Sequence, residues 1–370
     1  GKPVEPHFKR YTARINSDHV LLKIKDFNAI TIGENLTYTH NTNSGVGIGN
    51  IYWNDVHNLL VGNPLMTVYN SDGDYYDQPS KVADNWGVAG FIANPIAEMH
   101  YRRGQNLSKS HSLFANVYLE LQPIKNLRFR SSFGYRMSAS SYRQYTPIYN
   151  LSTTTVNTTD DVSQNQSLGY SYTLDNTLSY IFDMGEDHGL DALIGQSAEK
   201  WGMGEGVSGG NSNTLFPGSW DHAWLTNTQG VTAGVTSVSG SPWGEGGLAS
   251  FFGRLNYDYK EKYMATLIVR ADGSSNFARG NRWGYFPSAS AGWLVSNEDF
   301  MEDARDFVDF FKLRGSWGRN GNASISPFQY LATVSFDTQN GYYFGNDKAN
   351  IVTGGYADIL PNPDVTWETS

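Results

Sequence analysis

Apolar and polar residues alternate in several segments of the chain. In residues 113–121 every odd position is apolar, whereas Asn116 and Glu120 occupy even positions between them. Residues 127–137, 172–182, 251–259 and 263–272 repeat this period of two. Because successive side chains of a β-strand point to opposite faces, each segment is predicted to form a strand with one apolar and one polar face. The fold class predicted from this pattern is all-β.

The connections between these strands alternate in length. We expect about ten strands, with short connections near residues 25–27, 122–126, 183–188 and 260–262, and a fifth over 297–310 that holds one helical turn. The long connections are predicted at about 41–110, 141–166, 204–247 and 272–284, and after Arg319. Short and long connections therefore fall at opposite ends of the strands. This is the plan of a transmembrane antiparallel β-barrel with short periplasmic turns and long extracellular loops.

The side chains at the strand ends and on the polar face agree with a barrel in a membrane. Tyr257, Tyr259 and Tyr263 gather at a short turn, where an outer-membrane barrel carries aromatic residues. Three arginines on one face of one strand would be costly in a dry core but suit a wet lumen or a contact with a plug. Five arginines are predicted by parity to face the lumen: Arg128, Arg130, Arg136, Arg254 and Arg270. By the same parity Asp272 lies beside Arg270, so the two are candidates for an ion pair.

Composition narrows the class of partner. The 370 residues include no cysteine, which excludes disulfides and thiolate metal sites. The net charge of -9 argues against a nucleic-acid partner. No apolar run is long enough for a membrane helix, but barrel strands expose only alternate residues to lipid, so their mean hydropathy stays low. We also expect the sequence to be an internal segment of a longer polypeptide, because it has no leader at its start.

A soluble β-sandwich or propeller would also show alternation. Strands of soluble proteins are usually shorter and lack aromatic residues at both ends, and no repeat of blade length is present. The barrel interpretation is therefore preferred.

Motifs for catalysis and metal binding are weak. Gly206, Ser208 and Gly210 match a nucleophile elbow but lack the strand before it and the helix after it. The eight histidines show no metal-ligand spacing. We therefore predict no catalytic residue, no metal site and no cofactor. Asp72, Asp74 and Asp77 resemble half of a calcium loop without its glutamate, and the choice between calcium and turn chemistry stays open.

Aromatic residues in the long connections are the candidate ligand contacts. They are mixed with Asn, Asp, Ser and Gly, and rings beside such donors and acceptors suit a sugar or an extended peptide. An alternative is that these rings pack the loops against each other or against a partner. The candidates are Trp53, Tyr69, Tyr75, Tyr76, Trp86, Trp220, Trp224 and Trp243.

Longer motifs carry a family resemblance. They are GRLNYDYKEKY at 253–263, RADGSSNFARGNRWGYFPSASAGW at 270–293 and KLRGSWGRNGN at 312–322, with NPLMTVYNSDGDY at 63–75 and LPNPDVTWETS at 360–370 in the same order. These segments resemble the barrel of SusC/RagA-type TonB-dependent transporters of Bacteroidetes-like bacteria. The resemblance spans most of the chain.

The resemblance implies a partial barrel within a larger structure. Family barrels have about 22 strands around a plug; residues 1–370 would be part of one barrel domain, without the plug and the remaining strands. The protein would be located in the cell outer membrane, in contact with its lipid, and would import oligosaccharides or peptides. The implied partners are a SusD-like surface lipoprotein that acts as a lid, and TonB–ExbB–ExbD acting through the plug. A dimer of transporter–lid pairs is a further assembly that the family suggests.

Two other function classes remain. A TonB-dependent siderophore or cobalamin receptor would share the barrel and plug but lack the lid. A soluble glycan-binding or glycan-cleaving β-protein would, for cleavage, need two carboxylates about 5 to 9 Å apart, and the sequence identifies no such pair.

Overall fold

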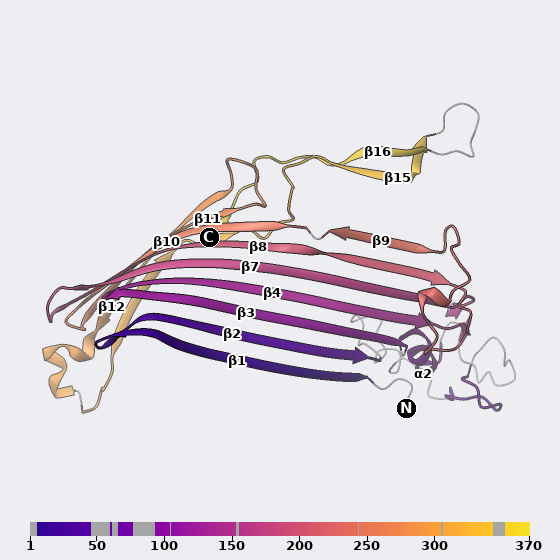
Figure 1. Cartoon of the computed structure of the whole chain (residues 1–370), viewed down its shortest axis with the longest axis horizontal. Helices are drawn as coiled ribbons and strands as arrows, with labels where there is room; N and C mark the ends of the chain where they lie inside the picture. The colour runs from indigo at the N-terminus through magenta and orange to yellow at the C-terminus, as the bar shows by residue number, and fades with distance from the viewer. Residues whose placement is uncertain are drawn as a thin grey trace.

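The structure is a computed structural model that describes residues 6–45, 60, 66–76, 93–103, 105–152, 155–242, 244–304, 306–342 and 352–370. Its main feature is one antiparallel sheet of 11 strands, curved and twisted as Figure 1 shows. Ten strands follow one another as neighbours in chain order, and β9 pairs with β8 outside this path. The predicted partial antiparallel barrel is therefore confirmed.

The strands of the main sheet are long. They are β1 (His7–Ile24), β2 (Phe27–Ser44), β3 (Asn106–Ile124), β4 (Leu127–Thr146), β7 (Asp161–Asp183), β8 (His188–Ser212), β9 (Ser237–Pro242), β10 (Gly246–Tyr259), β11 (Tyr263–Ser274), β12 (Trp283–Leu294) and β13 (Lys312–Gly318). Several continue into regions predicted as loops. Residues 204–212 belong to β8, and β9 lies inside the predicted loop 204–247. These extensions are rich in glycine and polar residues, so they lack the apolar alternation that identifies a strand.

Smaller elements occupy the connections. They are α2 (Pro95–Glu98), η3 (Met99–Arg103), η4 (Leu225–Asn227), η5 (Val295–Asn297), η6 (Asp299–Ala304), and the short strand pairs β5 (Tyr149–Asn150) with β6 (Val156–Asn157), β14 (Gly321–Asn322) with β17 (Glu368–Thr369), and β15 (Thr333–Tyr342) with β16 (Val352–Ile359). In Figure 1 the tight turns lie at one end of the sheet and α2 lies at the other. No helix in the described part of the chain is long and apolar enough to cross a membrane.

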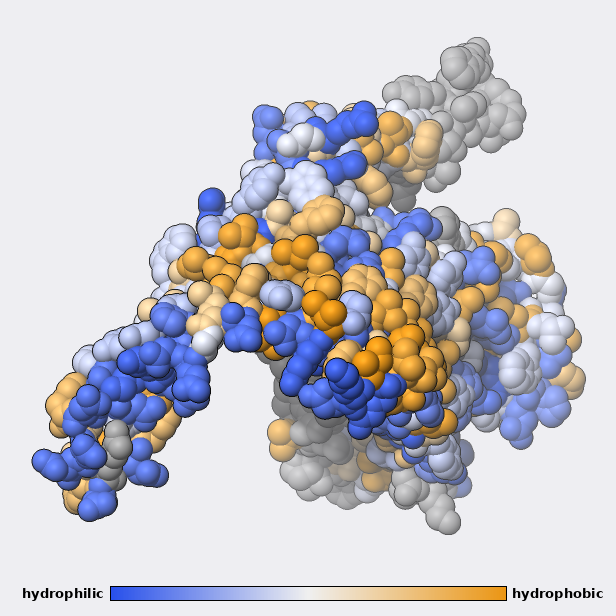
Figure 2. Space-filling model, turned by 60° about the vertical axis from the view of Figure 1, so that its left-hand side comes forward, coloured by the Kyte–Doolittle hydropathy of each residue, from blue (hydrophilic) through white to orange (hydrophobic). Residues whose placement is uncertain are grey.

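Strand register places the apolar residues on one face. Leu255 pairs with Leu267 on one side and Ala192 on the other, and Ile194 and Val269 flank Gly253 one row away. Ile194, Leu267 and Val269 are 62%, 55% and 56% exposed. An exposed apolar belt of this kind suits contact with lipid. Figure 2 shows apolar residues gathered in the middle of the molecule between more hydrophilic ends.

Glycines show which face is concave. A Cβ built at Gly134, on the polar face, would lie 2.6 Å from Thr173 Oγ1, and one at Gly195 would collide with the Phe252 ring. On the apolar face a Cβ at Gly253 meets only a backbone oxygen at 3.8 Å, and one at Gly315 meets nothing within 4 Å. Side chains converge on a concave surface and diverge on a convex one. The polar face is therefore concave, and the apolar face is convex.

The best-buried cluster lies outside the belt. Tyr145, Val162 and Ala223 are each 1% exposed, with Trp220 and Leu225 packed against them. Tyr145 and Val162 are register partners on the convex face of β4 and β7. Residues 213–236 therefore fold over the convex face at the ends of these strands far from the tight turns.

Candidate functional site

Five aromatic rings form a continuous stack at the end of the sheet that carries α2. Tyr69 stacks on Tyr75 with ring centroids 5.3 Å apart, and Tyr75 meets His100 and Tyr101 edge-on at 5.6 and 5.7 Å. His100 and Tyr101 are stacked at 5.1 Å, and Tyr101 stacks on Tyr149 at 5.6 Å. The stack thus joins two long connections, one between β2 and β3 and one between β4 and β7.

Local turn chemistry holds this stack in place. The Asn70 side chain accepts hydrogen bonds from the backbone N–H groups of Asp72 and Asp74, and Gly73 has a φ of 88° that favours glycine. Tyr69 and Tyr75 consequently face each other across the turn. Asn94 caps α2 and donates a hydrogen bond to the Val68 carbonyl, which ties the helix to the same turn.

The rings are partly withdrawn from water. Burial lowers the pKa of His100, whose Nδ1 lies 3.1 Å from the Tyr75 hydroxyl. Burial also raises the pKa values of Tyr75 and Tyr101. Burial therefore favours the uncharged forms of His100, Tyr75 and Tyr101. Tyr69 is 55% exposed and presents a free apolar surface at the end of the stack.

The predicted ligand aromatics are divided among different places. Tyr69 and Tyr75 lie in the stack, whereas Tyr76 is only 2% exposed and offers no ring surface to a ligand in this conformation. Trp220 and Trp224 lie on the convex face, where they enclose the guanidinium of Arg143 at 4.0 and 3.9 Å from their ring centroids. Trp53, Trp86, Trp243 and Asp77 lie outside the described residues.

Sequence reasoning missed three members of the stack: His100, Tyr101 and Tyr149. Each lies in a predicted long connection, the same position that identified Tyr69 and Tyr75. Extending the aromatic criterion to every ring in these connections would have found them. Their mutual contact was not predictable, because irregular loops have no period.

The five predicted arginines share the concave face by register. Glu120 lies 3.4 Å from Arg128 and 3.7 Å from Arg130, and the Arg130 guanidinium lies 3.8 Å from the centroid of the Tyr118 ring. The ion pair expected between Arg270 and Asp272 is present at 2.8 Å. Ser250 accepts a further hydrogen bond from Arg270. Arg136 and Arg254 continue the same face on β4 and β10.

Charges on the concave face are segregated by strand. Strands β1 to β4 place five arginines and two carboxylates there: Arg10, Arg14, Arg128, Arg130, Arg136, Asp18 and Glu120. Strands β7 and β8 place five carboxylates and no lysine or arginine there: Asp161, Asp175, Asp183, Asp191 and Glu199. A basic wall therefore adjoins an acidic wall, which suits a ligand that carries both signs of charge.

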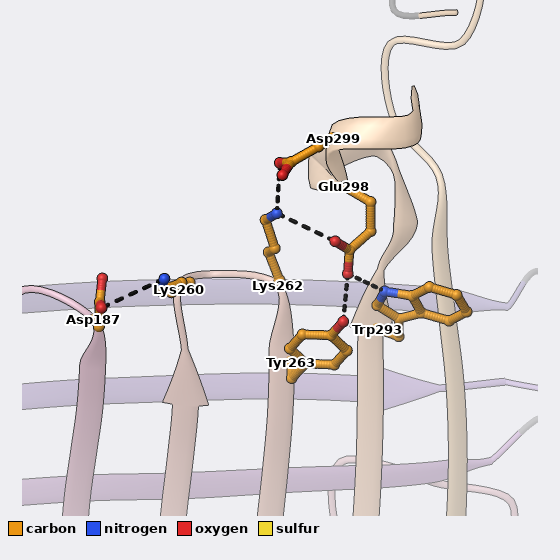
Figure 3. A network of polar contacts seen from close by, with 7 residues as sticks. All are labelled: Asp187, Lys260, Lys262, Tyr263, Trp293, Glu298 and Asp299. Atoms are coloured by element: carbon orange, nitrogen blue, oxygen red, sulfur yellow. Dashed lines mark hydrogen bonds and ion pairs between the residues drawn. The ribbon is translucent and has the colours of Figure 1, made fainter. Parts of the chain in front are cut away.

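A polar network fixes the connection after β12 at the tight-turn end (Figure 3). Glu298 accepts hydrogen bonds from the Tyr263 hydroxyl at 2.6 Å and the Trp293 indole at 2.9 Å, and Lys262 Nζ contacts Glu298 and Asp299 at 3.2 and 3.1 Å. The hydrogen bond from Tyr263 is the largest cause that lowers the Glu298 pKa. Lys260 pairs separately with Asp187 at 3.5 Å. This network orders η5 and η6 against the sheet.

Catalytic and metal chemistry find little support in the described residues. Ser208 lies within β8 and contacts Ser239 of β9 at 2.6 Å, so its G-x-S-x-G motif is not a strand-to-helix elbow. The described ranges contain no group of three or more His, Asp or Glu side chains arranged to hold a metal ion.

Comparison with known proteins agrees with this architecture. Residues 52–370 match the family model described as TonB dependent receptor-like, beta-barrel. A TonB-dependent receptor of Formosa agariphila is 29% identical over 98% of the chain and 33% of the relative. The TonB-dependent receptor SusC of Bacteroides thetaiotaomicron is 28% identical over 74% of the chain and 26% of the relative.

A solved structure gives the same fold. The RagAB peptide importer in its closed-closed state aligns with a TM-score of 0.74 at 21% identity, over 99% of this chain and 38% of the other. The chain thus spans about a third of the length of the curated relatives that it matches. The resemblance found in the sequence motifs is confirmed.

Proposed function

The chain belongs to the TonB-dependent receptor β-barrel family, and from this premise we propose that it forms part of the wall and outer ligand surface of a SusC-like nutrient importer. Members of this family are outer-membrane receptors. The tight-turn end would then face the periplasm and the end with α2 the outside. The convex apolar belt would contact lipid, and the concave face with its five predicted arginines would line the lumen.

The substrate we propose is an oligosaccharide. The observation that carries this proposal is the stack of Tyr69, Tyr75, His100, Tyr101 and Tyr149, with Tyr69 exposed at its end. Sugar rings stack on aromatic faces, and backbone and amide groups in the same loops supply hydrogen bonds. The proposed partners are a SusD-like lipoprotein over these loops and TonB–ExbB–ExbD for energy, with a dimer of transporter–lid pairs as the proposed assembly.

A peptide is the second candidate. The basic wall of β1 to β4 beside the acidic wall of β7 and β8 is complementary to a chain with both signs of charge, whereas a neutral glycan gains little from it. The relative named as a peptide importer shares the fold. Salt dependence distinguishes the candidates, because attraction between exposed charges weakens as ionic strength rises.

The test begins with the complete protein extracted from outer membranes in mild detergent. We expect it to co-purify with a smaller lipoprotein and to bind oligosaccharides with little dependence on salt. Tyr69→Ala should weaken binding about fivefold or more, since a ring contact contributes ~1 kcal/mol beyond its buried area. Tyr11→Ala, which removes an exposed tyrosine from β1, should leave binding unchanged. A protein soluble without detergent would contradict the transporter, and binding equal in both variants would contradict the site.

A further inference from the structure

The convex face changes character beyond the apolar belt. Tyr38, Leu113, Met137 and Tyr170 form the last largely apolar row across β2, β3, β4 and β7. The next convex positions toward the outer end of β1 to β4 are mostly polar or basic. The basic ones, which we call the basic band, are His7, Lys9, His40, His111, Lys109 and Arg143.

Charge on this band opposes that of the whole chain. The protein carries a net charge of -9, yet the convex positions of β1 to β4 beyond the apolar row include no carboxylate. Acidic groups close to the band include Glu205 on the convex face of β8, Asp221 in the loop beside Arg143, and Asp160, which accepts a hydrogen bond from Tyr145 at the end of β4. Lys9, Lys109 and Arg143 therefore give the band a local positive charge above the apolar belt.

A pocket of about 220 Å³ opens within the basic band. Its convex lining includes Lys109, Ser141, Arg143, Gln164, Gln166 and Trp224. Arg143 is held between two indole rings and donates a hydrogen bond from Nη1 to the Ala223 carbonyl at 3.2 Å. Its Nε is buried without a hydrogen-bond partner. Cations, amides, a hydroxyl and a half-exposed indole thus converge on one small space.

The distance of the pocket from the apolar belt, counted in rows along the strands, indicates which ligand it binds. Convex rows are two residues apart, or about 7 Å along a strand, so Lys109 and Arg143 lie two and three rows above the last largely apolar row. In the orientation proposed above, this is the level of the saccharide headgroups of the outer leaflet. We propose that the basic band binds the phosphate-bearing saccharide headgroup of an outer-leaflet glycolipid, with the pocket as the phosphate site.

The chemistry of the pocket fits this ligand. Arginine and lysine favour phosphate, and the exposed face of Trp224 can stack on a sugar ring beside the amides of Gln164 and Gln166. The transported substrate does not reach this surface, because the pocket opens on the convex face and the lumen lies on the concave one. The proposal rests on the membrane orientation but not on the identity of the substrate.

The test uses the complete transporter, stripped of lipid in detergent, and native mass spectrometry to count bound glycolipid. The probe is a bisphosphorylated lipid A that carries its inner-core sugars. Lys109→Gln should weaken binding about fivefold, the effect of one charge near an anionic headgroup. The double variant with Arg143→Gln should bind less still. Lys25→Gln, which removes an exposed charge at the opposite end, should bind like the unmodified protein.

Two further measurements show whether the pocket recognises a phosphate on a glycolipid or free inorganic phosphate. The dephosphorylated glycolipid should bind equally to the unmodified protein and to Lys109→Gln, because it lacks the phosphate that Lys109 contacts. Inorganic phosphate at the glycolipid's concentration should not compete. Equal binding of both glycolipids, unchanged binding in Lys109→Gln, or full competition by inorganic phosphate would each overturn the proposal. Because Lys109 is exposed, its single variant decides the question even if Arg143→Gln disturbs the loop.

Discussion

Single glycines determine how this sheet can bend. The register between β7 and β8 shifts between Tyr170 and Tyr172, where β8 accommodates an extra residue. Gly204, next to this bulge, has a φ of 129°, and a Cβ there would collide with the backbone carbonyl of Leu168. Backbone cannot move aside as a flexible side chain can. The segment of β8 next to the bulge therefore requires glycine at this position.

We predict that Gly204→Ala destabilises the barrel by roughly 1 to 3 kcal/mol, the range for a residue forced into a strained conformation. Gly253→Ala is the matched control, because its Cβ would meet only a backbone oxygen at 3.8 Å. The control should be neutral or more stable by up to ~1 kcal/mol. Urea unfolding of the refolded barrel measures both variants. Equal stability of the two variants would show that β8 tolerates a side chain at position 204.

Glu298 is a second residue whose role can be isolated. Its lowered pKa means that its stabilising effect is present above the ordinary glutamate value of 4.5 and is lost as the pH falls below it. We predict that amide exchange in η6 accelerates on acidification from pH 7 to pH 4, once the intrinsic rate is corrected. Glu298→Gln should show the faster exchange already at pH 7. Exchange that is unchanged in this variant would exclude Glu298 as the residue that holds the connection.

At the scale of elements, the loop that covers the convex face is attached through one buried tyrosine. The Tyr145 hydroxyl donates to Asp160 at 3.0 Å and accepts from the Gly218 backbone N–H at 2.6 Å. Asp160 in turn accepts a hydrogen bond from the Thr214 backbone N–H at 3.0 Å. These bonds connect the end of β4 to the start of the loop that carries Trp220 and Trp224.

Removing this hydroxyl should therefore loosen the loop while the sheet remains intact. We predict that Tyr145→Phe costs ~1 to 3 kcal/mol locally, because the buried Asp160 carboxylate and the Gly218 backbone N–H each lose a hydrogen-bond partner. Limited proteolysis should cut within residues 213–236 faster than in the unmodified protein. Tyr142→Phe is the control, since Tyr142 is 37% exposed and its hydroxyl donates a hydrogen bond to Gln144 of the same strand. Equal cleavage of the two variants would contradict the attachment.

At the scale of the whole molecule, the assignment of the concave face to the lumen makes a direct prediction. Single cysteines are introduced into the naturally cysteine-free chain at Arg128 and Arg136 on the polar face and at Phe129 and Phe133 on the apolar face. In intact outer membranes a membrane-impermeant maleimide should label the first two after plug opening and leave the second two unlabelled. A lipid-soluble maleimide should reach Phe129→Cys and Phe133→Cys. The reverse labelling pattern would show that the apolar face, and not the polar face, lines the lumen.

The sequence by itself determined the strands, their faces and the family. Alternation is a local property of the extended backbone, so residues 113–121 or 251–259 identify a strand and its apolar face without knowledge of neighbours. The ion pair of Arg270 with Asp272 followed from the same parity and is present, and the five predicted arginines share one face by register, while their position in the lumen stays a prediction. The ends of the strands were predicted less accurately. Outside the apolar belt both faces of a strand are polar, so no alternation marks where the strand ends.

Only the tertiary structure decided which loop residues meet. Tyr69 and Tyr75 join Tyr101 and Tyr149 through two connections that are far apart in sequence, whereas Trp220 and Trp224 turn to the opposite face to enclose Arg143. Nothing in the sequence separated these aromatic residues, because all of them lie in long connections rich in Asn, Asp, Ser and Gly. Irregular loops have no repeating geometry that would project a side chain in a known direction, so their contacts depend on the path of the whole chain and on what the curved sheet leaves open to them.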